Sequence, residues 1–220
     1  MKNVIYLILV ALLVFTSCKK DSNPTSQSED ASTVTYSGKV YHTVKIGNQT
    51  WLKENLDVGV MIQSTANQSN NGTIEKYCYN NDTANCTKYG GLYQWDEAMA
   101  YDTANGTKGI CPTGWHIPME AEFETLMAKV GNDGNKLKRE DQGTGSGLGT
   151  NTSGFSVLLA GSHYDDDFND LGDYGRFWSS TEESDAPYAC AMTLWNIDGG
   201  INDFYYNKGV GCSIRCIKDN

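Results

Sequence analysis

Cysteine is the residue type in this chain best suited to chemistry, because a thiol can form a disulfide, bind a metal or act as a nucleophile. The sequence holds seven cysteines, of which Cys18 directly follows an apolar N-terminal segment. The other six are Cys78, Cys86, Cys111, Cys190, Cys212 and Cys216. No Cys-x-x-Cys spacing occurs among them, so a metal site is not predicted. An even number of cysteines is typical of disulfides in an exported protein.

The spacing of the cysteines restricts how they pair. Cys78 and Cys86 flank a turn-rich segment, and we predict that they close a small loop. Cys212 and Cys216 lie in an alternating, strand-like run, where residues four apart share a face about 13 Å apart, too far for a disulfide. They therefore require other partners, and Cys111 and Cys190 are the remaining candidates.

The other residues suited to catalysis are scattered along the chain. There are three histidines, His42, His116 and His163, and no Gly-x-Ser-x-Gly or phosphate-binding loop motif. We expect each histidine to have a structural or surface role. No catalytic set and no cofactor site is predicted.

A dense group of carboxylates lies between residues 165 and 173. Asp165, Asp167, Asn169 and Asp170 offer oxygen ligands that calcium prefers, but the segment departs from the EF-hand pattern at its sixth and twelfth positions. We favour a solvated acidic hairpin loop, with calcium binding as the alternative.

Aromatic residues give a second candidate site, because flat rings stack on sugar faces and their polar tips form hydrogen bonds. The candidates lie in or near predicted loops and are Tyr164, Tyr174, Trp195, Tyr205 and Tyr206. The tryptophans Trp51, Trp95, Trp115 and Trp178 are expected in the core.

Two Asp-Thr-Ala sequences resemble a short acceptor for bacterial O-glycosylation, which makes Thr83 and Thr103 candidate modification sites; two ordinary polar turns are the alternative.

Composition excludes several classes of protein. The 220 residues carry a net charge of −10, and the densest basic cluster, residues 136–139, is offset by Glu140 and Asp141. Such a chain does not attract nucleic acid. With 39% hydrophobic residues, 11% aromatic residues and 23 glycines, the composition is typical of one compact α+β domain with many turns.

The N-terminus predicts export and lipidation. Residues 1–17 form a lipoprotein signal peptide, with an apolar core too short for a membrane span, and Phe15-Thr16-Ser17-Cys18 resembles a bacterial lipobox. Cys18 is therefore the predicted lipid anchor, through which the protein has the membrane as a partner. Residues 18–33 form a flexible tether that lacks large apolar side chains after the cysteine. Because Lys19 follows Cys18, we expect the outer membrane, on a leaflet that the sequence does not define.

The remaining chain predicts elements that position these groups. A hairpin is expected within residues 34–60, a long loop over 61–91, and short helices at 95–100 and from Pro118 to Val130. A mobile loop is expected over 132–153. Strand candidates follow at 155–160, 177–180, 188–194, 203–207 and 213–218. Arg215, between Ile214 and Cys216, is expected to point away from their shared face toward a carboxylate.

Five separated segments carry a family resemblance. They are residues 38–56, 89–99 with Tyr-Gly-Gly-Leu-Tyr-Gln-Trp-Asp, 111–118 with Cys-Pro-Thr-Gly-Trp-His-Ile-Pro, 177–182 with Phe-Trp-Ser-Ser-Thr-Glu, and 213–219 with Ser-Ile-Arg-Cys-Ile-Lys-Asp. In order and spacing they resemble the Fibrobacter succinogenes major paralogous domain, over residues 34–219. Met119 stands where that family usually has Thr, which removes a side-chain cap from the following helix.

The resemblance implies a fold similar to C-type-lectin-like domains and to the formylglycine-generating enzyme group. It implies an N-terminal hairpin, two short helices, an antiparallel sheet in which the chain ends meet, and long disulfide-stapled loops. It also implies an outer disulfide Cys111–Cys216 that encloses an inner one, Cys190–Cys212.

These observations predict a lipid-anchored envelope protein that displays a non-catalytic binding domain. Its expected partner is a carbohydrate, or else an extracellular protein. One alternative is an oxidoreductase of the formylglycine-generating type, which a free, titratable thiol in the native protein would favour. The other is a purely structural envelope protein.

Overall fold

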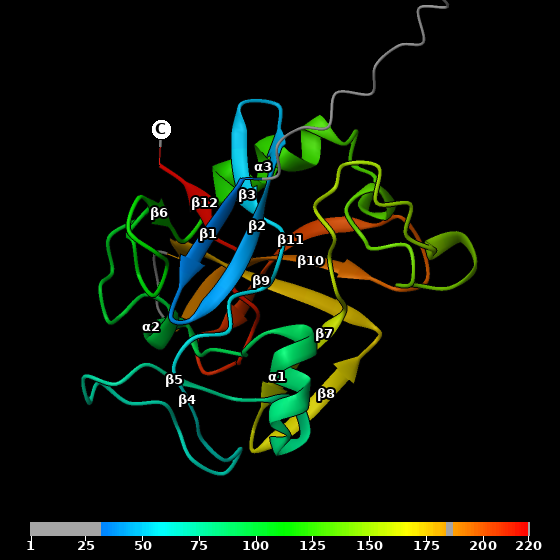
Figure 1. Cartoon of the computed structure of the whole chain (residues 1–220). Coiled ribbons are helices and arrows are strands. Elements are labelled where there is room, and N and C mark those ends of the chain that lie inside the picture. The colour runs from blue at the N-terminus through cyan, green and yellow to red at the C-terminus, as the bar shows by residue number, and fades with distance from the viewer. Residues whose placement is uncertain (1–31, 184–186, 220) are drawn as a thin grey trace, which may run out of the picture. The chain divides into compact units, whose positions relative to one another are not determined.

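The structure is a computed structural model that describes residues 32–183 and 187–219 (Figure 1). The predicted signal peptide, Cys18 and the tether up to residue 31 lie outside the described residues. The first strand begins at Thr33. None of the helices in the described part of the chain is long and apolar enough to cross a lipid bilayer.

Strands dominate the domain, and its helices are short. The helices are α1 (Thr83–Tyr89), α2 (Trp95–Ala98) and α3 (Glu120–Lys129), with 3₁₀ turns η1 (Tyr79–Asn81), η2 (Gly134–Lys136) and η3 (Gly145–Gly147). The strands are β1 (Thr33–Tyr36), β2 (Lys39–Ile46), β3 (Gln49–Leu52), β4 (Val60–Met61), β5 (Glu75–Lys76), β6 (Trp115–His116), β7 (Ala160–Tyr164), β8 (Asp167–Leu171), β9 (Tyr174–Glu182), β10 (Tyr188–Trp195), β11 (Ile201–Asn207) and β12 (Ile217–Lys218). The coarse prediction of a mixed fold is confirmed, with a mainly β character.

The two ends of the domain meet in the first sheet, whose strand order is β1-β2-β3-β12-β6. Ile217 on β12 pairs with Trp51 on β3 and with His116 on β6, all antiparallel. In Figure 1 the red C-terminal strand accordingly lies beside the blue N-terminal hairpin. The family resemblance implied this arrangement.

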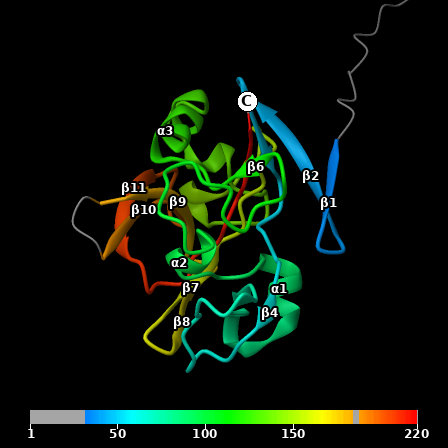
Figure 2. The ribbon, with the colours of Figure 1, turned by 90° about the vertical axis from the view of Figure 1, so that its left-hand side faces the viewer.

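The second sheet has the order β11-β10-β9-β7-β8. It is antiparallel except where β7 meets β9, whose pairing at Gly161 and Gly175 is parallel. Helix α3 packs against β9 and β10, as both views show (Figure 2). This packing is explained by Phe123, Leu126 and Met127, which recur at helical spacing and are buried.

Two clusters of buried side chains form the core. One holds Trp95, Trp115 and Trp178, and the other holds Trp51 together with the buried face of α3. The four tryptophans assigned to the core from the sequence are at most 5% exposed.

Several predicted loops and boundaries are corrected by the structure. The segment 61–91 contains α1, which Asp82 initiates by accepting a hydrogen bond from the Ala84 backbone N–H. The segment 132–153, expected to be a mobile loop, contains η2 and η3. Of the strand candidates at 155–160 and 213–218, only Ala160 and residues 217–218 are in strands.

The acidic segment forms a hairpin of its own, with β7 and β8 as its strands. Asp165 and Asp166 occupy its turn with φ of 52° and 67°. Left-handed backbone at both central residues suits a tight hairpin turn, and aspartate tolerates that conformation better than most residues. The predicted acidic hairpin loop is therefore confirmed, although its strands were not foreseen.

Candidate functional site

Aromatic side chains collect on one face of the second sheet. Strand register places Tyr174 opposite Trp195 and Ala189 opposite Tyr206. Ring centroids lie 6.5 Å apart between Tyr174 and Trp195, and 6.3 Å apart between Trp195 and Phe204. Phe204 continues the row to Tyr206 at 6.4 Å. Alternation along three neighbouring strands thus brings four rings to one surface.

A groove of about 590 Å³ lies at the end of this aromatic row. Strands β7, β8, β9, β10 and β11 supply most of its walls. Its lining residues combine tyrosine rings with amide, carboxyl, hydroxyl and guanidinium groups and are Ser162, Tyr164, Asn169, Asp170, Arg176, Tyr188, Tyr205, Tyr206, Asn207 and Val210. We call this surface the tyrosine groove. Its volume lies within the range of small-molecule sites.

Arg176 organises the polar side of the tyrosine groove. Its guanidinium donates to Asp170 Oδ2 at 2.8 Å and to Ser162 Oγ at 3.1 Å. Its Cζ lies 4.5 Å from the Tyr174 ring centroid and 5.5 Å from that of Tyr206. Burial opposes the charged form, but Tyr206 and Asp170 outweigh it and raise the pKa of Arg176. The arginine is therefore a fixed cation with a carboxylate partner.

The five predicted aromatic residues have different positions. Tyr164 and Tyr206 line the tyrosine groove, whereas Tyr174 and Trp195 belong to the adjoining aromatic row. Tyr205 also lines the groove, but its hydroxyl donates to Glu120 Oε2 at 3.0 Å. Arg176 is not predicted from the sequence. The available signal is its position between Tyr174 and Phe177, at the start of a strand.

The calcium candidates are not gathered as a metal site. Asp165 forms the hairpin turn, Asp167 begins β8, and Asn169 and Asp170 face the tyrosine groove, where Asp170 binds Arg176. Within residues 32–183 and 187–219, no group of three or more His, Cys, Asp or Glu side chains is arranged to hold a metal ion. The calcium alternative for this hairpin therefore has no cluster to support it.

Two of the three expected disulfides are formed. Cys78 is bonded to Cys86, and Cys111 is bonded to Cys216 across a sequence separation of 105. The expected inner disulfide is wrong, because Cys190 and Cys212 are free and buried.

Strand alternation explains why Cys190 and Cys212 do not pair. Ala189 and Ala191, which flank Cys190 on β10, share a core cluster with Cys212. Cys190 therefore points to the other face of its strand. There, burial and the carboxylates of Asp203 and Glu120 raise the pKa of Cys190 above its usual range. Burial raises the pKa of Cys212 to about 12.

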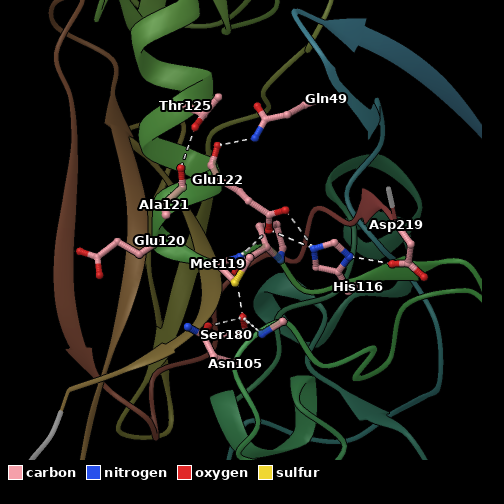
Figure 3. A network of polar contacts seen from close by, with 12 residues as sticks. Gln49, Asn105, His116, Met119, Glu120, Ala121, Glu122, Thr125, Ser180 and Asp219 are labelled. Carbon is pink, nitrogen blue, oxygen red and sulfur yellow. Dashed lines mark hydrogen bonds and ion pairs between the residues drawn. The ribbon is translucent and has the colours of Figure 1, made fainter.

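The three histidines do not meet. His42 Nδ1 lies 2.8 Å from Glu54 Oε1 at the surface, and the buried His163 stacks on Tyr77 with ring centroids 3.8 Å apart. Figure 3 shows His116 between two carboxylates, with Nδ1 2.7 Å from Asp219 Oδ1 and Nε2 3.0 Å from Glu122 Oε2. Glu122 also accepts from the Met119 backbone N–H at 2.9 Å, which is the half of a capping box that does not need a side-chain cap at residue 119.

The two Asp-Thr-Ala sequences adopt the same local geometry. In each, the aspartate Oδ1 accepts from the alanine N–H at 2.9 Å. Thr83 and Thr103 are both exposed. Their modification remains a prediction.

Taken together, the fold and the groove define a class of protein: a disulfide-bonded, mainly β domain whose termini meet in one sheet and whose second sheet presents an aromatic groove. The family model of the Fibrobacter succinogenes major domain matches residues 44–218. The chain belongs to this family. It has no significant match among curated proteins or among solved structures.

Proposed function

We propose that this protein is a non-catalytic, carbohydrate-binding domain of the cell envelope. The tyrosine groove is the observation that carries the proposal. Tyr164 and Tyr188 are 55% and 42% exposed, so their rings are available to stack on a sugar face. Asn169, Asn207 and Asp170 offer amide and carboxylate groups for sugar hydroxyls.

The charges of the groove favour an uncharged sugar. Asp170 is the carboxylate partner of Arg176, so the pair presents nearly equal and opposite charges at 2.8 Å. An anionic sugar would have to compete with Asp170 for the guanidinium. A neutral hexose can accept from Arg176 and donate to Asp170 without breaking the pair.

A lectin-like fold is part of this proposal. It is supported by the chain ends that meet in the first sheet and by the Cys111–Cys216 disulfide that ties the C-terminus to the segment before β6. Membership of the family does not by itself assign a ligand.

We further propose that the domain is exported and anchored in the outer membrane through a lipid on Cys18. The lipobox-like sequence and the polar segment that follows support this assignment. Because β1 begins at Thr33, about fourteen residues separate the anchor from the first strand.

Measuring glycan binding by the Tyr164→Ala variant and by the unaltered protein tests the proposal. We would screen a panel of neutral oligosaccharides and measure the affinity of the hits by calorimetry. Loss of one stacking ring should weaken binding about tenfold, since stacking contributes about 1.4 kcal/mol. Tyr101→Ala is the matched control, because Tyr101 is also partly exposed but lies outside the groove.

Two results would contradict the carbohydrate assignment. One is that no neutral glycan binds or shifts the melting temperature, which favours a structural envelope role. The other is that Tyr164→Ala and Tyr101→Ala weaken binding equally.

The free thiols favour a second candidate function, that of an oxidoreductase of the formylglycine-generating type. Such chemistry needs accessible thiolates that act together. Cys190 and Cys212 are both buried, have raised pKa values and face opposite sides of β10, which supports the non-catalytic proposal. Thiol titration with a chromogenic disulfide discriminates the two. We expect no reactive thiol in the native domain and two after unfolding; a rapidly reacting native thiol would support the enzyme.

A further inference from the structure

A second cavity, of about 490 Å³, lies apart from the tyrosine groove and shares no lining residue with it. Its walls come from β2, the segment after β3, helix α1 and residues around 139–158. Five lining residues are cationic and two are acidic: Lys39, Lys53, Lys88, Arg139 and Arg215 against Glu54 and Asp57. This excess of three positive charges stands out on a chain with a net charge of −10. We call it the basic cavity.

Arg215 is the unusual member of this set, because it is 0% exposed. From its position in the sequence, Arg215 is predicted to pair with a carboxylate, and this prediction is wrong. Its guanidinium donates to Asn55 Oδ1 and to the backbone carbonyls of Leu52 and Phe155, all of them neutral. None of the ion pairs in the described part of the chain includes Arg215.

The aromatic rings beside Arg215 offset only part of the free-energy cost of burying its charge. The Arg215 Cζ lies 4.5 Å from the Phe155 ring centroid and 5.4 Å from that of Phe177. Burial lowers the pKa of Arg215 to about 9, which leaves the side chain cationic at neutral pH. The Glu54 carboxylate favours the charged form of Arg215, although the two side chains form no ion pair. A buried charge without an ion-pair partner is costly, and its field is weakly screened toward the adjoining cavity.

The rim of the cavity does not cancel this charge. Asp57 already pairs with Lys39 and with Lys76. Arg139 is neutralised by Asp141, which lies outside the lining. Glu54, which contacts His42, offsets part of the remaining positive charge. Lys53 and Lys88 form no ion pair among the described residues, and the Lys88 Nζ lies over the Tyr89 ring. The cavity is therefore a partly enclosed space with a buried cation in its wall and two unpaired cations around it.

We propose that the basic cavity binds a small molecule of about monosaccharide size through an oxyanion group, namely a carboxylate, sulfate or phosphate. Lys53 and Lys88 contact the oxyanion, which supplies the buried Arg215 with the negative charge that none of the ion pairs in the described part of the chain provides. The guanidinium and ammonium groups at such a site favour oxyanions over neutral ligands. This inference does not depend on the carbohydrate assignment of the tyrosine groove.

Calorimetry at low ionic strength with four probes tests the proposal. The probes are inorganic phosphate, sulfate, glucuronate and, as the neutral counterpart of the last, glucose. We expect at least one anion to bind and glucose not to bind in this cavity. Binding of phosphate or sulfate alone identifies a free oxyanion as the ligand, whereas preferential binding of glucuronate identifies an acidic sugar.

Charge-removing variants locate the site. The double variant Lys53→Gln/Lys88→Gln should weaken anion binding about tenfold, because each rim charge contributes on the order of 0.7 kcal/mol. Lys45→Gln is the matched control, since Lys45 is exposed on the same hairpin and does not line the cavity. Tyr164→Ala should leave anion binding unchanged, which separates this site from the tyrosine groove.

Three outcomes would overturn the proposal: no anion binds, glucose binds as tightly as glucuronate in a manner that depends on Lys53 and Lys88, or Lys45→Gln weakens binding as much as the double variant. The rim variants keep the test decisive even if replacement of the buried Arg215 prevents folding.

Discussion

Two arginines, each between two aromatic rings and each at the wall of a cavity, behave differently in this molecule. Arg176 lies over Tyr174 and Tyr206 and donates to Asp170. Arg215 lies over Phe155 and Phe177 but donates only to an amide and to backbone carbonyls. The aromatic packing is similar around both arginines. The two sites differ in that Arg176 has a carboxylate partner, Asp170.

We propose that this difference gives the two cavities opposite ligand preferences. Where the cation has its own counter-ion, the surface is polar but nearly neutral, and a ligand gains mostly from stacking and hydrogen bonds. Where the cation has none, a ligand gains by supplying the missing negative charge. The position of one carboxylate, rather than the shape of the cavity, thus separates a site for neutral ligands from a site for anions.

Arg215→Met should have the largest effect on the protein. The substitution leaves the buried acceptors of Asn55, Leu52 and Phe155 without their donor, and each unsatisfied acceptor costs about 1–3 kcal/mol. We expect the free energy of unfolding, measured in urea, to fall by about 3 kcal/mol or more. Arg176→Met is the comparison, because Arg176 is partly exposed and should cost less. Equal losses would mean that burial of the cation does not distinguish the two sites.

Removal of the Cys78–Cys86 disulfide should have the next largest effect on stability. It should also lower ligand affinity at only one of the two cavities. The loop it closes has a sequence separation of 8, for which chain entropy predicts a loss of about 2.5 kcal/mol in the double serine variant. Cys86 lies in α1 and lines the basic cavity. Anion affinity should therefore fall while neutral-glycan affinity at the tyrosine groove is retained. A parallel loss at both sites would show that the two cavities are mechanically coupled.

Asp170→Asn should make the tyrosine groove prefer anions, as is proposed for the basic cavity. The substitution removes the counter-charge of Arg176 at a position that is partly exposed. A single charge at this distance contributes on the order of 1 kcal/mol near water, so the groove should gain about fivefold in affinity for glucuronate relative to glucose. Competition calorimetry in the Lys53→Gln/Lys88→Gln background isolates the groove. An unchanged preference would refute the role given to Asp170.

His116→Gln should have the smallest effect and should leave both ligands unaffected. Hydrogen bonds to Glu122, and secondly to Asp219, raise the pKa of His116 above its usual range near 6.5. Because the folded-state pKa is raised, the stabilising contribution is fully present below about pH 6.5 and is lost as the pH rises through the folded pKa.

The stability difference between the unaltered protein and His116→Gln should therefore be about 1 kcal/mol near pH 5.5 and smaller near pH 9. Urea denaturation at both pH values measures it. A difference that grows with pH would contradict the proposed pairing of His116 with the two carboxylates.

Local patterns were enough to predict several elements of this fold. The helix from Glu120 follows from the helical spacing of Phe123, Leu126 and Met127, and the hairpin follows from the turn at Gly47 and Asn48. The same patterns failed where a strand depends on distant partners. Residues 155–159 have a strand-like composition, yet β7 begins only at Ala160, where pairing with β8 and β9 becomes available.

The tyrosine groove was partly visible in the sequence. Aromatic residues at 164, 205 and 206 suggested a ligand surface, and these residues do line the groove. Their polar partner was not visible, because Arg176 meets Asp170 only through the β7–β8 hairpin and the parallel contact of β7 with β9. The sequence did not indicate the basic cavity, since its five cations come from five separate segments.

By itself, the sequence determined the family, the helix and hairpin with strong local periodicity, the buried tryptophans and the short disulfide Cys78–Cys86. These features depend on neighbours within a few residues or on motifs that identify the family. Only the tertiary structure decided that Cys190 and Cys212 stay apart, that Asp170 pairs with Arg176, and that Arg215 forms no ion pair with a described residue. Each of these outcomes depends on which face of a strand a side chain occupies and on which distant segment covers that face.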